Sequence, residues 1–167
     1  DGLCALGAEL TIESGYIKAA APHGLKGAKI IFPKVSVGAT ENMMMAAALA
    51  EGQTVLTNAA REPEVIDLGE CLIKMGALIE GLGTGTITIT GIKKLQGAVH
   101  SVVPDRIETG TYMIAVALAG GTVRLKNARA EHLTALIAPL EKAGLTITQE
   151  GSDIIVSRNG KPLSGTD

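Results

Sequence analysis

The chain has 167 residues and a formal net charge of −2 at pH 7, which argues against a protein that binds the phosphate backbone of a nucleic acid and needs a basic face for it. Hydrophobic residues make up 46% of the chain and predict a sizeable core, whereas aromatic residues make up only 2% and so provide no stacking platforms for single-stranded nucleic acid. No apolar run approaches the roughly 20 residues that span a bilayer, so neither a nucleic acid nor a membrane is expected as a partner.

Residues 1–21 are interpreted as a last helical turn followed by a β-hairpin. Residues 28–32 then predict a short buried strand, which Pro33 ends because proline has no backbone donor. Residues 39–51 are rich in Ala, Met and Leu and predict a helix that Gly52 terminates. A strand, a helix and a hairpin are expected to follow at residues 54–58, 63–75, and 78–80 with 86–90.

An internal repeat organises the chain. Asn58 and Asn127 align 69 positions apart within similar flanking residues. Gly7, Gly76 and Gly144 align with spacings of 69 and 68 positions. Equal spacing across three copies predicts a repeated βαβαββ unit. The second full copy is expected at residues 99–103, 107–119, 122–127, 131–143, and 145–149 with 154–157.

The joints between the repeat units are predicted at residues 23–24 and 97–104. A domain would not naturally begin in the middle of its own repeat, so we expect this chain to be a fragment of a longer protein. Its two cysteines, Cys4 and Cys71, lack the spacing of a metal site, which is typical of a protein from a reducing cytoplasm.

The first candidate site is the stretch Lys34-Val35-Ser36-Val37-Gly38-Ala39-Thr40, which joins the predicted strand to the predicted helix. Unpaired backbone N–H groups at a helix start, next to a lysine, attract anions and phosphate above all. Local chemistry alone favours a simpler interpretation, in which a Ser or Thr caps the helix and the lysine is solvated.

A second candidate stretch, residues 104–111, occupies the same place in the second unit. Asp105 is expected to cap the following helix, and Glu108 would complete a capping box. The functional alternative is that Asp105, Arg106 and Glu108 line a cleft shared with Lys34.

Three further patterns predict ordinary structure. Residues 61–64, Arg-Glu-Pro-Glu, form a favourable helix start with proline at the first position. The glycine-rich residues 81–85 lie inside a hairpin and not between a strand and a helix, so a dinucleotide loop is rejected. The three histidines show neither metal-ligand nor catalytic-triad spacing: His23, His100 and His132.

Residues 34–40, 58–64 and 104–111 together resemble the enolpyruvyl transferase family, and specifically its members that act on UDP-N-acetylglucosamine. The resemblance implies an α/β (α+β) fold, an inside-out α/β barrel of repeated βαβαββ units with helices inside and sheets outside. It implies that residues 1–103 end one domain and that residues 104–167 form the first unit of the other. The first part would hold a partial unit and a full unit, at residues 1–24 and 25–97.

The resemblance also implies an activity: the enolpyruvyl group of phosphoenolpyruvate passes to the 3-hydroxyl of UDP-N-acetylglucosamine, with release of phosphate, as the first committed step of peptidoglycan synthesis. No cofactor or metal is implied. The family pattern assigns the UDP-sugar site to Lys34, Val35, Ser36 and Val37. It places three further residues near the cleft: Glu62, Asp105 and Arg106.

The chain departs from the family pattern at its cysteine. The catalytic cysteine of the family lies in a loop of the type Gly-Cys-x-x-Gly-x-Arg-Pro, but Cys4 is followed by Ala-Leu-Gly-Ala. Cys4 is therefore not expected to be the nucleophile, and the isolated chain is expected to be inactive without the remaining segments of the same polypeptide. Two alternatives stay open: a stand-alone nucleotide-sugar-binding or scaffolding module of two repeats, and a piece of 5-enolpyruvylshikimate-3-phosphate synthase, against which the Lys34 motif argues.

Overall fold

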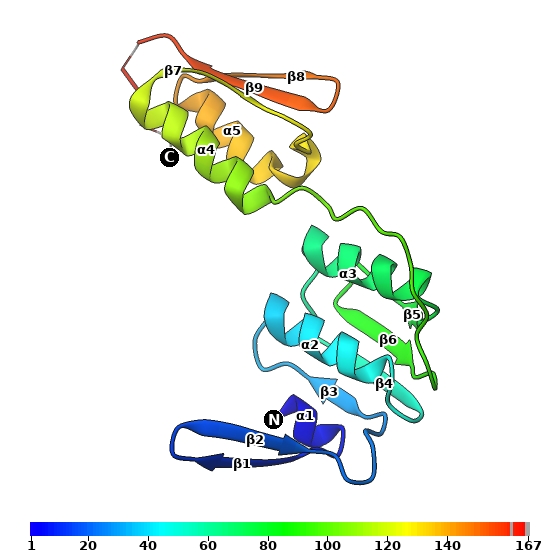
Figure 1. The fold of residues 1–167 in the computed structure, drawn as a ribbon. Helices are drawn as coiled ribbons and strands as arrows, with labels where there is room; N and C mark the ends of the chain where they lie inside the picture. The colour runs from blue at the N-terminus through cyan, green and yellow to red at the C-terminus, as the bar shows by residue number, and fades with distance from the viewer. Residues whose placement is uncertain (161, 166–167) are drawn as a thin grey trace. The chain divides into compact units, whose positions relative to one another are not determined.

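Two units follow one another along the chain, Asp1–Val103 and Pro104–Asp167. The computed structural model describes residues 1–160 and 162–165. Each unit has its own cluster of buried apolar side chains, and the elements of each unit are labelled in Figure 1.

The first unit begins with a short helix and a hairpin and continues with a complete βαβαββ unit. Its elements are α1 (Gly2–Ala5), β1 (Glu9–Glu13), β2 (Tyr16–Ala20), β3 (Lys29–Ile31), α2 (Val37–Ala47), β4 (Gln53–Thr57), α3 (Pro63–Lys74), β5 (Leu78–Glu80) and β6 (Thr86–Thr90). The order from β3 to β6 confirms the repeat that the sequence predicts for this part of the chain.

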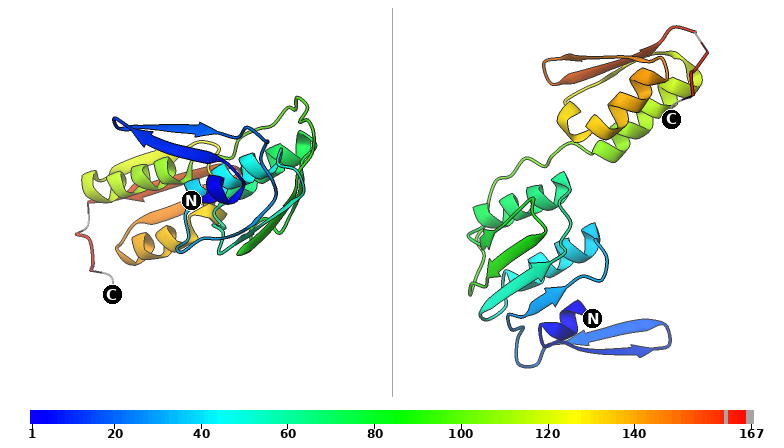
Figure 2. Two further views of the ribbon diagram at one scale, coloured as in Figure 1. Left: turned by 90° about the horizontal axis from the view of Figure 1, so that it is seen from below. Right: turned by 180° about the vertical axis from the view of Figure 1, so that it is seen from behind.

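The main sheet of the first unit has the strand order β3-β4-β6-β5. Strand β3 is parallel to β4, as a crossover through α2 requires, and the other pairs are antiparallel. Helices α2 and α3 contact each other and the strands, and they lie side by side over the sheet (Figure 1). Figure 2 shows the sheet from its other side.

Alternation along the strands explains why one face of this sheet is covered. Thr54 and Leu56 of β4 are buried, as are Ile87 and Ile89 of β6, whereas the residues between them are more exposed. These side chains pack against the apolar residues of α2, among them Met44, which is 0% exposed. The carboxyl ends of the parallel strands β3 and β4 therefore reach the same edge of a firmly packed layer.

The second unit is built from α4 (Arg106–Ala119), β7 (Gly121–Leu125), the 3-10 turn η1 (Ala130–His132), α5 (Thr134–Lys142), β8 (Thr146–Glu150) and β9 (Asp153–Arg158). Its antiparallel sheet has the order β7-β9-β8. Helices α4 and α5 contact each other and this sheet (Figure 1). Met113, Ile154 and Val156 are fully buried between the layers.

The predicted strand at residues 99–103 is wrong, because the structure has neither helix nor strand there. Two of the apolar residues that predict it are instead exposed, Val99 at 96% and Val102 at 78%. The polar groups of the segment bind a helix: His100 Nε2 lies 3.0 Å from Asp67 Oδ1, and the Val103 N–H donates to the same oxygen at 3.1 Å. The second copy of the repeat is therefore αβαββ in this structure.

Candidate functional site

The first part of the candidate site is the start of α2. Ser36 is the N-cap, and its Oγ accepts the Ala39 N–H at 3.3 Å, so the predicted hydroxyl cap is confirmed. Helix geometry gives Val37 and Gly38 no intrahelical acceptor for their N–H groups. Lys34 is exposed immediately before this turn. The helix start thus combines an exposed lysine with backbone donors that an anion can use.

The second part of the site is the turn that joins β4 to α3. Asn58 has a left-handed backbone with φ 59°, and its Nδ2 donates to the Phe32 carbonyl at 2.9 Å. The N–H of Ala60 donates to Thr40 Oγ1 at 3.0 Å. These two bonds tie the turn to the segment around Lys34. The stretch around Lys34 and the turn after β4 lie close together because β3 and β4 are parallel. Each stretch follows the carboxyl end of its strand, and these two ends lie at the same edge of the sheet.

The two parts border one hollow of about 450 Å³. Its lining residues are Val35, Asn58, Ala59, Arg61 and Glu62. The structure therefore brings two of the predicted site residues, Val35 and Glu62, to one hollow, whereas Lys34, Ser36 and Val37 are neighbours of Val35 in the chain but do not line it. Sequence reasoning missed Asn58 and Arg61 as lining residues, although both belong to the motif at residues 58–64.

Charge near the hollow is mixed. The Arg61 side chain is exposed, and the Glu62 carboxylate accepts the Arg61 N–H at 2.8 Å. Burial of the Glu41 side chain, and secondarily the negative charge of Glu64, raise the pKa of Glu41 above its ordinary value of 4.5. Lys34 and Arg61 therefore bring positive charge to this edge of the sheet, beside carboxylates that disfavour additional negative charge.

The candidate residues of the second unit lie at the start of α4. Asp105 is the N-cap, and its Oδ1 accepts the N–H groups of Ile107 at 2.8 Å and Glu108 at 3.0 Å, which confirms the predicted cap. Asp105 and Glu108 line a hollow of about 380 Å³ together with Arg124 and Lys126, whereas Arg106 is half-buried and lies outside that lining. The carboxylate of Asp105 is thus engaged in the helix cap.

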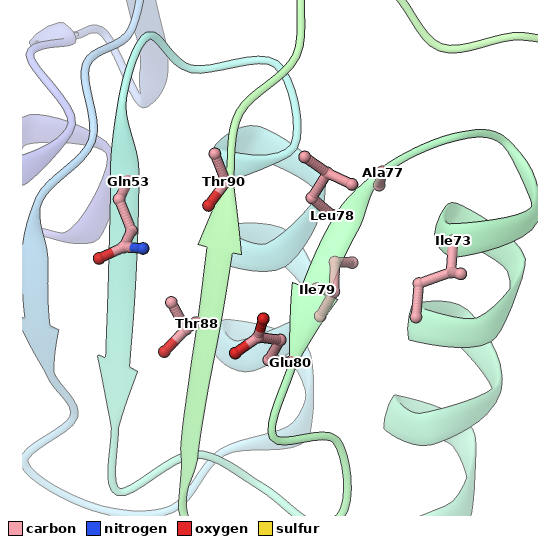
Figure 3. Close-up of a pocket in the computed structure, with 8 residues that line it drawn as sticks. All are labelled: Gln53, Ile73, Ala77, Leu78, Ile79, Glu80, Thr88 and Thr90. Atoms are coloured by element: carbon pink, nitrogen blue, oxygen red, sulfur yellow. The ribbon is translucent and has the colours of Figure 1, made fainter.

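A further hollow of the first unit, of about 250 Å³, is formed by β4, β5, β6 and α3 (Figure 3). Its lining residues are Gln53, Ile73, Ala77, Leu78, Ile79, Glu80, Thr88 and Thr90. The charged side chain of this lining is that of Glu80, and the lining contains neither lysine nor arginine. Its negative charge would repel a phosphate group, so this hollow does not suit a phosphate-bearing ligand.

Cys4 lies on α1 and is exposed, and Cys71 lies on α3 and is partly buried. Both cysteines are free.

Residues 81–85 form the turn between β5 and β6, where the Thr84 hydroxyl lies 2.8 Å from the carbonyls of both Gly81 and Thr86. This confirms the hairpin interpretation of the glycine-rich stretch.

Within residues 1–160 and 162–165, the structure contains no group of three His, Cys, Asp or Glu side chains arranged to hold a metal ion. In the same part of the chain, each helix is too short or too polar to cross a membrane.

Comparison with known proteins places these features in a family. Residues 1–167 match the family described as EPSP synthase (3-phosphoshikimate 1-carboxyvinyltransferase), and the chain belongs to this family. It is 60% identical over 160 residues to the UDP-N-acetylglucosamine 1-carboxyvinyltransferase of Azorhizobium caulinodans, covering 96% of this chain and 37% of that protein. The protein of the same description from Caulobacter vibrioides is 55% identical over 163 residues, covering 98% of this chain and 38% of the relative. The chain therefore spans less than two fifths of the length of these relatives.

Solved structures show the same fold. The enolpyruvyl transferase NikO of Streptomyces tendae superposes with a TM-score of 0.76 at 22% identity, covering 97% of this chain and 42% of that chain. An EPSP synthase from Acinetobacter baumannii gives a TM-score of 0.63 at 22% identity, covering 93% of this chain and 37% of that chain. The mixed α/β fold of the enolpyruvyl transferases, predicted from the sequence, is thereby confirmed.

Proposed function

We propose that this chain is part of an enzyme that transfers the enolpyruvyl group of phosphoenolpyruvate to the 3-hydroxyl of UDP-N-acetylglucosamine and releases phosphate, the first committed step of peptidoglycan synthesis. The observation that carries the proposal is the 60% identity to a UDP-N-acetylglucosamine 1-carboxyvinyltransferase across 96% of the chain. Identity to the EPSP synthase structure is only 22%, which favours the UDP-sugar over a shikimate substrate.

In this proposal Lys34, Val35, Ser36 and Val37 bind the diphosphate-sugar. The support is physical: an exposed lysine precedes a capped helix start whose first N–H groups have no intrahelical acceptor. A phosphate placed there gains both the lysine charge and oriented backbone donors. Glu62 would border the ligand in the hollow that Val35 also lines. Asp105 and Arg106 would lie in the substrate cleft of the intact enzyme.

Residues 1–103 would end one domain of that enzyme, and residues 104–167 would open the other. The remaining segments of the polypeptide would supply the groups that the chemistry still needs, because Cys4 stands outside the family's cysteine loop and is not the nucleophile. A cytoplasmic location is in keeping with two free cysteines.

The test is phosphate release from phosphoenolpyruvate in the presence of UDP-N-acetylglucosamine, measured for the intact enzyme, for the 167-residue chain, and for that chain mixed with the remaining segments. We expect turnover by the intact enzyme, none by the chain alone, and recovery on mixing, since positioning across a cleft is lost when half of the groups are missing. An intact enzyme that uses shikimate 3-phosphate instead would overturn the proposal. Tight UDP-sugar binding by the chain alone would favour a stand-alone binding module.

A further inference from the structure

Thr40 is a buried threonine that lies between the two segments of the candidate site. Its side chain is 0% exposed, and it belongs to the first turn of α2. The hydroxyl donates to the Ser36 carbonyl at 2.8 Å and accepts the Ala60 N–H at 3.0 Å. One oxygen atom thus bonds the start of α2 and the turn after β4 at the same time.

The loop that carries Lys34 is held at both ends by this arrangement. At its beginning, Asn58 Nδ2 donates to the Phe32 carbonyl at 2.9 Å. At its end, the Thr40 hydroxyl bonds the carbonyl of Ser36, the helix cap. Between these two anchors lie Pro33, Lys34 and Val35.

The bond to Ala60 is the one that no other group replaces. The Ser36 carbonyl also accepts the Thr40 N–H at 3.0 Å, so it keeps a partner if the hydroxyl is removed. Ala60 is 0% exposed, so without the hydroxyl its N–H would be buried and unsatisfied unless the turn moved. Because Arg61 and Glu62 follow Ala60 directly, such a movement would change the wall of the hollow.

We infer that Thr40 is a positioning residue of the UDP-sugar site: its buried hydroxyl fixes the Lys34–Val37 loop and the Ala60–Glu62 turn in one relative arrangement, without touching the ligand. The inference rests on the function proposed above. It predicts that loss of the hydroxyl weakens substrate binding as well as the fold, because the two segments are then no longer held in one arrangement before the ligand binds.

The chain offers a matched control in Thr54. This residue is also 0% exposed and lies on β4, a strand that α2 contacts, but its hydroxyl has no hydrogen-bond partner among the described residues. Thr54→Val therefore removes a buried hydroxyl from the same unit without breaking a hydrogen bond. Thr40→Val removes the hydroxyl that connects the two segments, and Thr40→Ser keeps it.

The experiment measures the dissociation constant of UDP-N-acetylglucosamine by calorimetry, together with KM, kcat and the thermal unfolding midpoint, for the intact enzyme and the three variants. We expect Thr40→Val to raise the dissociation constant and KM by up to about tenfold, because at most the free energy of one hydrogen bond is then spent on restoring the arrangement when the ligand binds. A smaller change in kcat is expected. Thr40→Ser and Thr54→Val should bind like the unmodified enzyme.

Wild-type affinity in Thr40→Val would overturn the inference while leaving the proposed function intact. Failure of the unmodified enzyme to bind the UDP-sugar would instead overturn the proposed function. If Thr40→Val does not fold, hydrogen exchange in the unmodified enzyme decides the question. UDP-N-acetylglucosamine should slow exchange in residues 58–62 as well as in residues 34–40, and unchanged exchange at residues 58–62 would refute the coupling.

Discussion

Asn58 and Asn127 lie 69 positions apart, and both have left-handed backbones, with φ values of 59° and 53°. Each follows the strand that comes after the first helix of its copy of the repeat: β4 after α2, and β7 after α4. Asparagine tolerates this conformation better than other residues with a Cβ. The two copies of the repeat therefore share the same left-handed backbone conformation at the point where the chain leaves the sheet.

The two side chains have different partners. Asn58 binds the carbonyl of Phe32 at the end of β3, whereas Asn127 Oδ1 accepts the Ser152 hydroxyl at 3.3 Å. The difference follows from the sheets, because β4 pairs with a parallel strand while β7 pairs with β9 in the three-stranded sheet of the second unit.

We predict that Asn127→Ala destabilises the protein by about 1–2 kcal/mol, because alanine pays the full cost of a left-handed backbone. Asn127→Gly removes the same side chain but tolerates the conformation, so it serves as the matched control. Urea unfolding of the two variants separates backbone strain from loss of the Ser152 contact. Equal destabilisation by Ala and Gly would show that the side chain, and not the backbone, matters at this position.

The proposed phosphate site gives a prediction for Lys34. Lys34→Ala in the intact enzyme should weaken UDP-N-acetylglucosamine binding by about 1–3 kcal/mol, the range for a lost charge-assisted hydrogen bond. Lys94→Ala is the control, since Lys94 is also exposed in the first unit but lies in the segment after β6. Calorimetric titration of both variants measures the effect, and an unchanged dissociation constant for Lys34→Ala would exclude the assignment.

Local signals in the sequence were sufficient for the helix starts. Ser36 and Asp105 cap α2 and α4 because a short polar side chain precedes an apolar helical run, and this depends on only a few neighbouring residues. The strand expected at residues 99–103 failed for the opposite reason. Whether an apolar segment becomes a strand depends on a neighbouring strand that accepts its hydrogen bonds, and here Asp67 of α3 takes the bonds of His100 and Val103.

The bridging role of Thr40 was likewise beyond sequence reasoning. The sequence indicates a helix cap and an anion site in the stretch that contains Thr40, and a motif in the turn at residues 58–64. The bond from Ala60 to Thr40 spans 20 positions and exists only because β3 and β4 are parallel and end together. A predicted crossover of this kind indicates which two loops meet, but it does not indicate which side chain connects them.

Asp67 fixes the segment that precedes the second unit, and this gives a third prediction. Its side chain is 17% exposed and that of His100 is 8% exposed. Lys74 Nζ lies 3.0 Å from His100 Nδ1, and because a lysine ammonium only donates, Nδ1 accepts and Nε2 carries the proton given to Asp67. Asp67→Ala should release residues 100–103 and accelerate both their hydrogen exchange and their cleavage by proteases.

Glu70→Ala is the control for this experiment, because Glu70 is exposed on the same helix, α3. The Glu70→Ala substitution removes one negative charge, as Asp67→Ala does, but it leaves the hydrogen bonds of Asp67 to His100 and Val103 in place. Protection of residues 100–103 that is equal in the two variants would contradict the role given to Asp67.

The last prediction concerns pH and the second unit. The Asn127 N–H donates to Asp153 Oδ1 at 3.0 Å, and Arg124 Nη1 donates to Asp153 Oδ2 at 3.2 Å. The hydrogen bond from Asn127, and then that from Arg124, lower the pKa of Asp153 below its ordinary value of 3.8. These bonds connect the beginning of β9 to the end of β7 and to the turn that follows it.

A carboxyl group with a lowered pKa in the folded state stabilises the protein above its unfolded-state pKa, and this stabilisation is lost as the pH falls through the folded-state pKa. Asp153→Asn should therefore lower the free energy of unfolding at neutral pH, and the difference from the unmodified protein should disappear well below the ordinary value of 3.8. Urea unfolding across this pH range measures the effect. A deficit that stays constant into acid would mean that Asp153 acts through packing, because only the ionised carboxylate can lose its contribution by protonation.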